Sequence, residues 1–215
     1  MDENSRYIYI IISETTTRFG YVLRRVGKVR FNHAAVALDE ELNEWYSFAR
    51  KQYHAALICG LVKENMDRYT LRRYSNVQAV IFRLPVTEEQ YQDVRKMIMG
   101  IEQDKEYMYN LFSVLTFPLL KGFSIYKAYS CIEFTATVLM LLGISLSKPT
   151  YQYTPDDLLE LLAEYKFFEG NLLDYKKPAE RDDYYFKPMQ FSQVFQSVWD
   201  LLRIAKRSVL SGLNG

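Results

Sequence analysis

The stretch "AYSCIEFTATVLMLLGI", residues 128–144, decides how this chain folds around Cys131. Phe134, Val138 and Leu142 recur at helical spacing, so the stretch predicts a helix. The polar segment before Cys131 places the sulfur in the first turn. There the backbone N–H groups and the positive end of the helix dipole lower a thiol pKa from about 8.5. Cys131 also lies one turn before Phe134 on the apolar stripe. The residues alone therefore leave two interpretations open, a core cysteine and a nucleophile.

The composition is that of an ordinary globular protein. Of the 215 residues, 49% are hydrophobic and 25% are charged, and the formal net charge is +1. A protein that binds nucleic acid would carry a basic excess, so we expect no nucleic-acid partner. With only two cysteines, Cys59 and Cys131, the chain does not resemble a disulfide scaffold, which favours a cytoplasmic protein. The N-terminal apolar run is too short for a secretory signal.

Hydrophobic periodicity predicts a mixed α+β fold. The β-branched and aromatic run "RYIYIIIS", residues 6–13, predicts a buried strand. Further strands are predicted at residues 33–38, 44–49 and 77–86, and capped helices begin at Thr87, with Gln90, and at Thr154, with Asp157. Residues 50–75 have no clear period and predict a loop with short pieces of structure.

After Tyr175 the composition changes. Residues 176–188 are charged and contain prolines, which predicts a linker or surface segment. An amphipathic helix follows, and its apolar face consists of Val194, Val198, Leu201, Leu202 and Ala205. We expect this face to pack on the domain. Because Arg203, Lys206 and Arg207 lie in its last turns, contact with a membrane is the alternative.

Few residues are candidates for catalysis. The chain has no CxxC or HExxH motif and no glycine-rich phosphate loop, so we expect neither a metal nor a cofactor. His33 and His54 are the only histidines, and any His-assisted mechanism must use one of them. His33 begins a predicted strand next to a loop, where its ring could reach a cleft or serve a structural role. Cys59, in "ALICGLV", is interpreted as a small buried hydrophobe.

The segments "FNHAAVALDEELNEWYSFAR" and "YSCIEFTATVLMLLGI", in that order, resemble the circularly permuted NlpC-type branch of the papain-like cysteine peptidases and amidases. The resemblance covers roughly residues 7–175. It implies a papain-like α+β fold in which an antiparallel sheet packs against helices and the nucleophile lies at a helix N-terminus. Residues 1–175 would form this permuted hydrolase domain, and residues 176–215 a linker and a C-terminal amphipathic helix that packs on it.

The resemblance also implies a mechanism. Cys131 would attack as a thiolate, and His33 would act as base and then as acid. The backbone N–H of Cys131 would contribute to an oxyanion hole. A third polar residue on the strand after the histidine strand orients the imidazole in this family, and Ser47 lies nearest that position, where family members often carry His, Glu, Asn or Gln. The implied substrate is a small peptide of the cell-wall type. The alternatives are an acyltransferase or lipid-amide hydrolase, and a binding protein that kept the fold.

Overall fold

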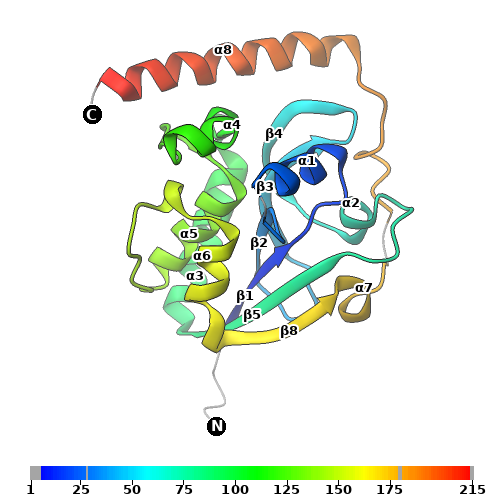
Figure 1. Ribbon diagram of the computed structural model, residues 1–215, viewed down its shortest axis with the longest axis vertical. Coiled ribbons are helices and arrows are strands. Elements are labelled where there is room, and N and C mark those ends of the chain that lie inside the picture. The colour runs from blue at the N-terminus through cyan, green and yellow to red at the C-terminus, as the bar shows by residue number, and fades with distance from the viewer. Residues whose placement is uncertain (1–5, 28, 179–180, 214–215) are drawn as a thin grey trace.

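A computed structural model describes residues 6–27, 29–178 and 181–213 of the chain (Figure 1). The predicted ranges 1–175 and 176–215 also contain residues 1–5, 28, 179–180 and 214–215, which lie outside the described residues. The strands are β1 (Arg6–Ser13), β2 (His33–Ala37), β3 (Trp45–Gln52), β4 (Ala55–Lys63), β5 (Gln78–Val86), β6 (Met108–Tyr109), β7 (Ala128–Tyr129) and β8 (Lys166–Asn171). The helices are α1 (Arg18–Gly27), α2 (Met66–Thr70), α3 (Glu88–Gln103), α4 (Leu111–Leu120), α5 (Cys131–Leu141), α6 (Pro155–Leu161), α7 (Leu172–Tyr175) and α8 (Phe191–Leu213).

Six strands form one antiparallel sheet in the order β4-β3-β2-β1-β5-β8. Strand β1 lies inside this sheet, and its alternate residues point to opposite faces. Ile8, Ile10 and Ile12 belong to one core, while Tyr9 and Ile11 belong to a second core on the other face. Burial on both sides explains why the strand is almost continuously apolar. The predicted mixed α+β class, with an antiparallel sheet packed against helices, is confirmed.

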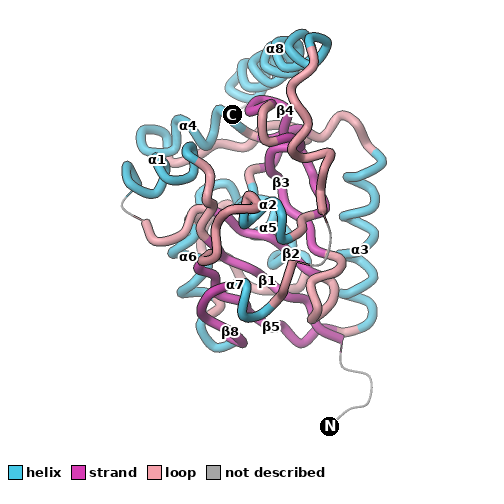
Figure 2. The backbone as a smooth tube through the Cα atoms, turned by 90° about the vertical axis from the view of Figure 1, so that its right-hand side faces the viewer, coloured by secondary structure: helices cyan, strands magenta, loops and turns pink. Residues whose placement is uncertain are grey.

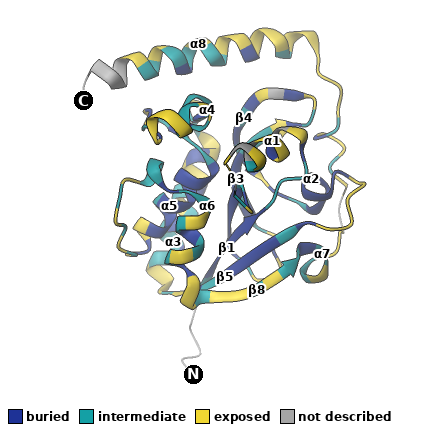
Figure 3. Ribbon diagram, viewed as in Figure 1, coloured by how far each residue is buried: buried dark blue, intermediate teal, exposed yellow. Residues whose placement is uncertain are grey.

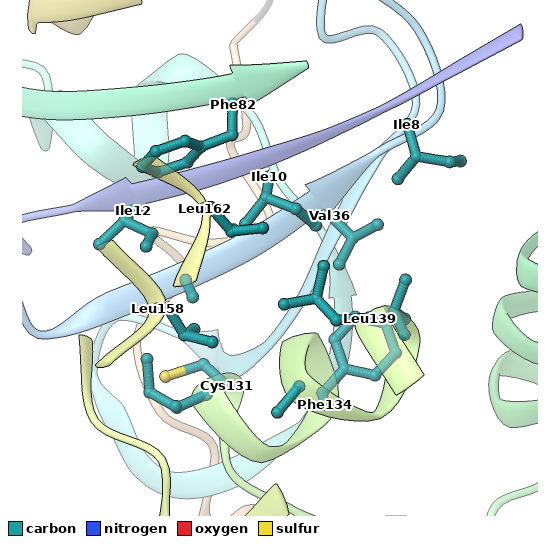
Figure 4. Packing of buried hydrophobic residues seen from close by; sticks show 14 of the residues in the cluster. Ile8, Ile10, Ile12, Val36, Phe82, Cys131, Phe134, Leu139, Leu158 and Leu162 are labelled. Atoms are coloured by element: carbon teal, nitrogen blue, oxygen red, sulfur yellow. The ribbon is translucent and has the colours of Figure 1, made fainter. Parts of the chain in front are cut away.

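Helices α3, α5 and α6 cover the first face of the sheet (Figure 1). From α5, Phe134 and Leu139 point toward the strands that carry Ile10 and Val36 (Figure 4). Both predicted capping boxes are present, at the start of α3 and at the start of α6. These caps satisfy backbone N–H groups that a helix start leaves without a partner.

The prediction for residues 50–75 is wrong. This segment contains β4, which pairs with β3 along almost its whole length, and the short helix α2. The apolar run 55–62 was a strand signal, but a glycine and a cysteine inside it obscure the alternation. The omission matters because Glu64 directly follows β4.

The segment after Tyr175 returns to the domain and ends in α8, which lies across α4 and β4 (Figures 1 and 2). The predicted C-terminal helix therefore packs on the same domain, but not through the predicted face. Val194, Val198 and Leu202 are exposed, whereas Ser197 and Ile204 are buried. Figure 3 shows exposed stretches along much of α8. No helix in the described part of the chain is long and apolar enough to cross a membrane.

Candidate active site

Cys131 is the first residue of α5 and is almost fully buried. Ser130 caps this helix, since its hydroxyl accepts a hydrogen bond from the N–H of Glu133 at 3.0 Å. The Glu133 carboxylate accepts in turn from the N–H of Ser130 at 3.4 Å, which completes a capping box. The cap fixes the backbone on both sides of the cysteine and turns Glu133 away from the sulfur.

His33 is the first residue of β2, where it pairs in register with Ser13 of β1. Its side chain is buried and lines the same cavity as Cys131, near enough for the two groups to shift each other's pKa. Its Nε2 atom lies 3.1 Å from Oε1 of Glu64, so Nδ1 is the ring nitrogen left for the sulfur. The structure thus brings together the two residues that the sequence selected, although 98 positions separate them along the chain.

Glu64 is the residue that holds the imidazole. Besides His33, its carboxylate accepts a hydrogen bond from the Ser47 hydroxyl at 2.5 Å and from Nε of Arg68 at 2.8 Å. Burial alone would raise the pKa of Glu64, but Arg68, His33 and Ser47 lower it to about 2. Glu64 is therefore a carboxylate at neutral pH, with each charge in contact with an opposite one.

The sulfur and the imidazole favour their charged forms. Burial opposes a charged His33, but its hydrogen bonds to Cys131 and Glu64 raise its pKa to about 10. Burial likewise opposes a thiolate at Cys131, yet His33 and the backbone N–H groups of Ala34 and Ile132 bring the pKa of this thiol below its ordinary value. Because the two groups interact, they titrate as a pair, and the thiolate–imidazolium form is the one stabilised here.

Tyr109 brings a phenol to the same sulfur. Strand β6, which contains Tyr109, pairs in parallel with β7, and β7 ends at Tyr129, two residues before Cys131. Burial of the phenol and its contacts with the sulfur of Cys131 raise the pKa of Tyr109 well above its ordinary value. The hydroxyl is therefore protonated and remains a hydrogen-bond donor. Sequence reasoning missed Tyr109, because nothing in "EYMYNLF" distinguishes it from its neighbouring aromatic residues.

Ser47 occupies a different place from the one implied by the resemblance. It is fully buried on β3. Its hydroxyl donates a hydrogen bond to Glu64, and it is Glu64 that contacts the imidazole. Ser47 therefore reaches His33 through the carboxylate. The orienting group comes from one strand further along the sheet than expected, just after β4. The only local signal was an acidic residue at the end of an apolar run.

The remaining candidates are less suited to catalysis. His54 is exposed in the turn between β3 and β4 and stacks edge-on against Tyr53. Cys59 is half-buried on β4 rather than fully buried as predicted. Burial nevertheless raises the pKa of its thiol to about 12. Two cysteines thus line one cavity, and only Cys131 has surroundings that favour a thiolate.

The cavity beside Cys131 has a volume of about 360 Å³. His33, Glu64 and Arg68 lie on its polar side, and its apolar walls come from Phe48, Leu57, Leu111 and Leu115. Tyr185, from the segment after Tyr175, also lines the cavity and stacks on the Arg68 guanidinium at 4.2 Å. Asp182 lies 3.6 Å from the same guanidinium. The C-terminal segment therefore supports the Arg68–Glu64–His33 chain and is more than a linker.

The arrangement has the parts of a thiol–imidazole–carboxylate triad at the base of a pocket. Within the residues that the structure describes, no group of three or more His, Cys, Asp or Glu side chains is placed to hold a metal ion. No family model, curated protein or solved structure matches this chain.

Proposed function

We propose that this chain is a cysteine hydrolase of amide bonds that works through a thioester intermediate. The observation that carries the proposal is that Cys131, at the start of α5, lines one cavity with His33, whose ring Glu64 holds at 3.1 Å. Nucleophile, base and orienting group in this order are the general arrangement of an activated nucleophile. The strand with His33 precedes the helix with Cys131, an order that supports the permuted papain-like fold.

In the first half of the reaction the Cys131 thiolate attacks the carbonyl carbon of the substrate. As the tetrahedral intermediate collapses, the C–N bond breaks, and the His33 imidazolium gives its proton to the leaving amine. In the second half His33, now neutral, takes a proton from water. The resulting hydroxide attacks the thioester, the carboxylic acid leaves, and the thiolate is restored. Glu64 stays ionised throughout and stabilises the imidazolium.

Two donors are placed for the oxyanion that develops during the attack. One is the backbone N–H of Cys131, which belongs to the first turn of α5 and has no partner within the helix. The other is the Tyr109 hydroxyl, which is kept protonated next to the sulfur. A neutral donor at this site stabilises the oxyanion through a hydrogen bond and keeps its own proton.

The resemblance suggests a small peptide of the cell-wall type as the substrate. The cavity favours a second candidate, an acyltransferase or lipid-amide hydrolase that forms the same thioester. Phe48, Leu57, Leu111 and Leu115 provide an apolar wall against which an acyl chain would bind. A binding protein without catalysis is the weaker alternative, because Glu64 supplies a carboxylate that orients His33.

Alkylation by iodoacetamide across a pH series, with mass spectrometry of each cysteine, tests the proposal. The Cys131 rate should reach its plateau at a pH below that of an ordinary thiol, about 8.5. Cys59, whose pKa is raised to about 12, is the internal reference and should react slowly throughout. A midpoint for Cys131 at or above the ordinary value would refute an activated nucleophile.

A screen of peptide amides and acyl amides then identifies the substrate class. Cys131→Ala should remove all turnover, whereas His54→Ala, at an exposed turn position outside the lining of the cavity, should retain it within about twofold. Turnover that survives in Cys131→Ala would sink the proposal.

A further inference from the structure

Helix α8 turns its apolar face away from the rest of the molecule. We call this the outer face. Its members are all exposed: Phe191, Val194, Phe195, Val198, Trp199, Leu202 and Val209. Phe195 and Ile204 lie on opposite sides of the helix, because nine residues make two and a half turns. Ile204 is 2% exposed and packs on the domain, while Phe195 is 65% exposed. A helix that served only to cover the domain would have the opposite orientation.

The outer face adjoins a second exposed apolar surface on α4. Leu115, Leu119 and Leu120 are exposed there. The two helices are joined by a small core in which Ile204 of α8 packs near Phe112 of α4. Leu115 also lines the cavity beside Cys131. The apolar surface therefore extends from α8 across α4 to the cavity.

Charge is distributed unevenly in the same region. Helices α1 and α8, together with α4 and its C-cap Lys121, contain seven of the chain's 27 Lys and Arg residues but one of its 26 Asp and Glu residues. These basic residues are Arg18, Arg24, Arg25, Lys121, Arg203, Lys206 and Arg207. Three of them are ion-paired, Arg24 with Glu14, Arg203 with Asp200 and Arg207 with Glu106. A surface of this kind is attracted to an anionic partner. A second copy of the chain would bring the same positive charges together.

We propose that the outer face of α8 and the exposed leucines of α4 bind the surface of an anionic lipid bilayer, with α8 lying in the plane of the headgroups. Aromatic and aliphatic residues on one side of a helix with lysine and arginine beside them are typical of interfacial helices. Helix α8 lies at the outside of the domain (Figure 2). Its apolar side chains are already exposed, so they can meet a flat surface without rearrangement. This proposal stands independently of the catalytic one.

The fluorescence of Trp199 can report on binding to vesicles. Of its two tryptophans, Trp45 is 1% exposed and Trp199 is 64% exposed. Vesicles of equal parts phosphatidylglycerol and phosphatidylcholine should shift the fluorescence of the full chain to shorter wavelength, because Trp199 leaves water. The same vesicles should carry the protein upward in a flotation gradient. Trp199→Phe should abolish the fluorescence shift and keep the flotation.

Matched variants separate the outer face from the rest of the surface. Phe195→Ser with Leu202→Ser should weaken partitioning at least about tenfold, since each removes an apolar side chain that the bilayer would bury. Met99→Ser, which changes an exposed apolar residue on α3, should bind like the original chain. Lys206→Glu with Lys121→Glu should weaken binding, Lys96→Glu on α3 should not, and added salt should weaken the original.

Three results would overturn the proposal. The first is a protein that does not float with these vesicles. The second is equal binding by the double-serine variant, and the third is a concentration-dependent dimer that the double-serine variant abolishes while vesicles have no effect. The last result would assign the outer face to a second copy of the chain.

Discussion

Helices α5 and α8 use their apolar residues in opposite ways. In α5 eight of eleven residues are buried, including Phe134, Val138 and Leu139. Helix α8 is twice as long, yet its large apolar side chains face outward and its contacts with the domain come mainly from the other side. Gln193 illustrates this, because its side-chain amide donates to Gln52 of β3 at 2.5 Å.

The difference teaches that a helix that is apolar on most sides must be buried in the domain. An amphipathic pattern predicts an apolar side but not what covers it. Helix α5 is apolar around most of its circumference, so burial is its only favourable environment in a folded domain. Helix α8 has one apolar side, and that pattern is satisfied by any apolar partner, whether the domain, another chain or a bilayer. The same argument explains why α5 holds Cys131 in the core while the apolar side of α8 stays exposed.

The largest expected effect is on stability when one phenylalanine is removed from each helix. Phe134→Ala should lower the free energy of unfolding by about 3–5 kcal/mol, because it opens a cavity in the core. Phe195→Ala makes the same chemical change on α8 and should stay within about 0.5 kcal/mol. Urea unfolding of both variants measures the difference. Equal losses would mean that the outer face of α8 is packed in solution.

The next effect concerns Glu133, a buried acid in the first turn of α5. Burial raises its pKa to about 7, against a hydrogen bond from Asn110 and one from Ser130 that lower it. The pKa of Glu133 is higher in the folded protein than in the unfolded chain, where it is about 4.5. The protonated side chain therefore contributes its full share of stability below about pH 4.5. That contribution is lost as the pH rises through 7.

Glu133→Gln carries no charge at any pH. Relative to the original chain, the variant should therefore gain about 3 kcal/mol of unfolding free energy between pH 4.5 and pH 8. Contributions from His33 and Glu64 are common to both proteins and cancel in the difference. Denaturant titrations at the two pH values provide the measurement, and a difference that does not change with pH would contradict it.

The smallest effect distinguishes the two helix starts. Ser130→Ala removes the side chain that caps α5 and should cost about 1 kcal/mol. Ser192→Ala, at an exposed position near the start of α8, is the control and should cost less than about 0.5 kcal/mol. Thermal unfolding of the pair, followed by circular dichroism, is sufficient. A Ser192→Ala variant as destabilised as Ser130→Ala would show that the start of α8 depends on a cap of its own.

Several parts of the fold and the site followed from local pattern. The buried strand β1, the strands β2 and β3, and the capped helices α3 and α6 were predicted because each has a strong period or a capping residue. Cys131 and His33 were candidates because of their places at a helix start and a strand start, and the resemblance to the permuted papain-like hydrolases then paired them. Strand β4 was missed, and Glu64 with it, because no local rule connects residue 64 to residue 33.

The sequence by itself determined the elements and the chemistry they could carry. Three features can be read from the sequence alone. They are an apolar helix that begins with a cysteine, a strand that begins with a histidine, and a C-terminal helix with one apolar side. Only the tertiary structure decided which groups meet. It placed Glu64 against His33, Tyr109 near Cys131 and Tyr185 against Arg68. It also left the apolar side of α8 exposed. Such contacts join residues far apart in the chain, and the free energy of packing the whole sheet selects them.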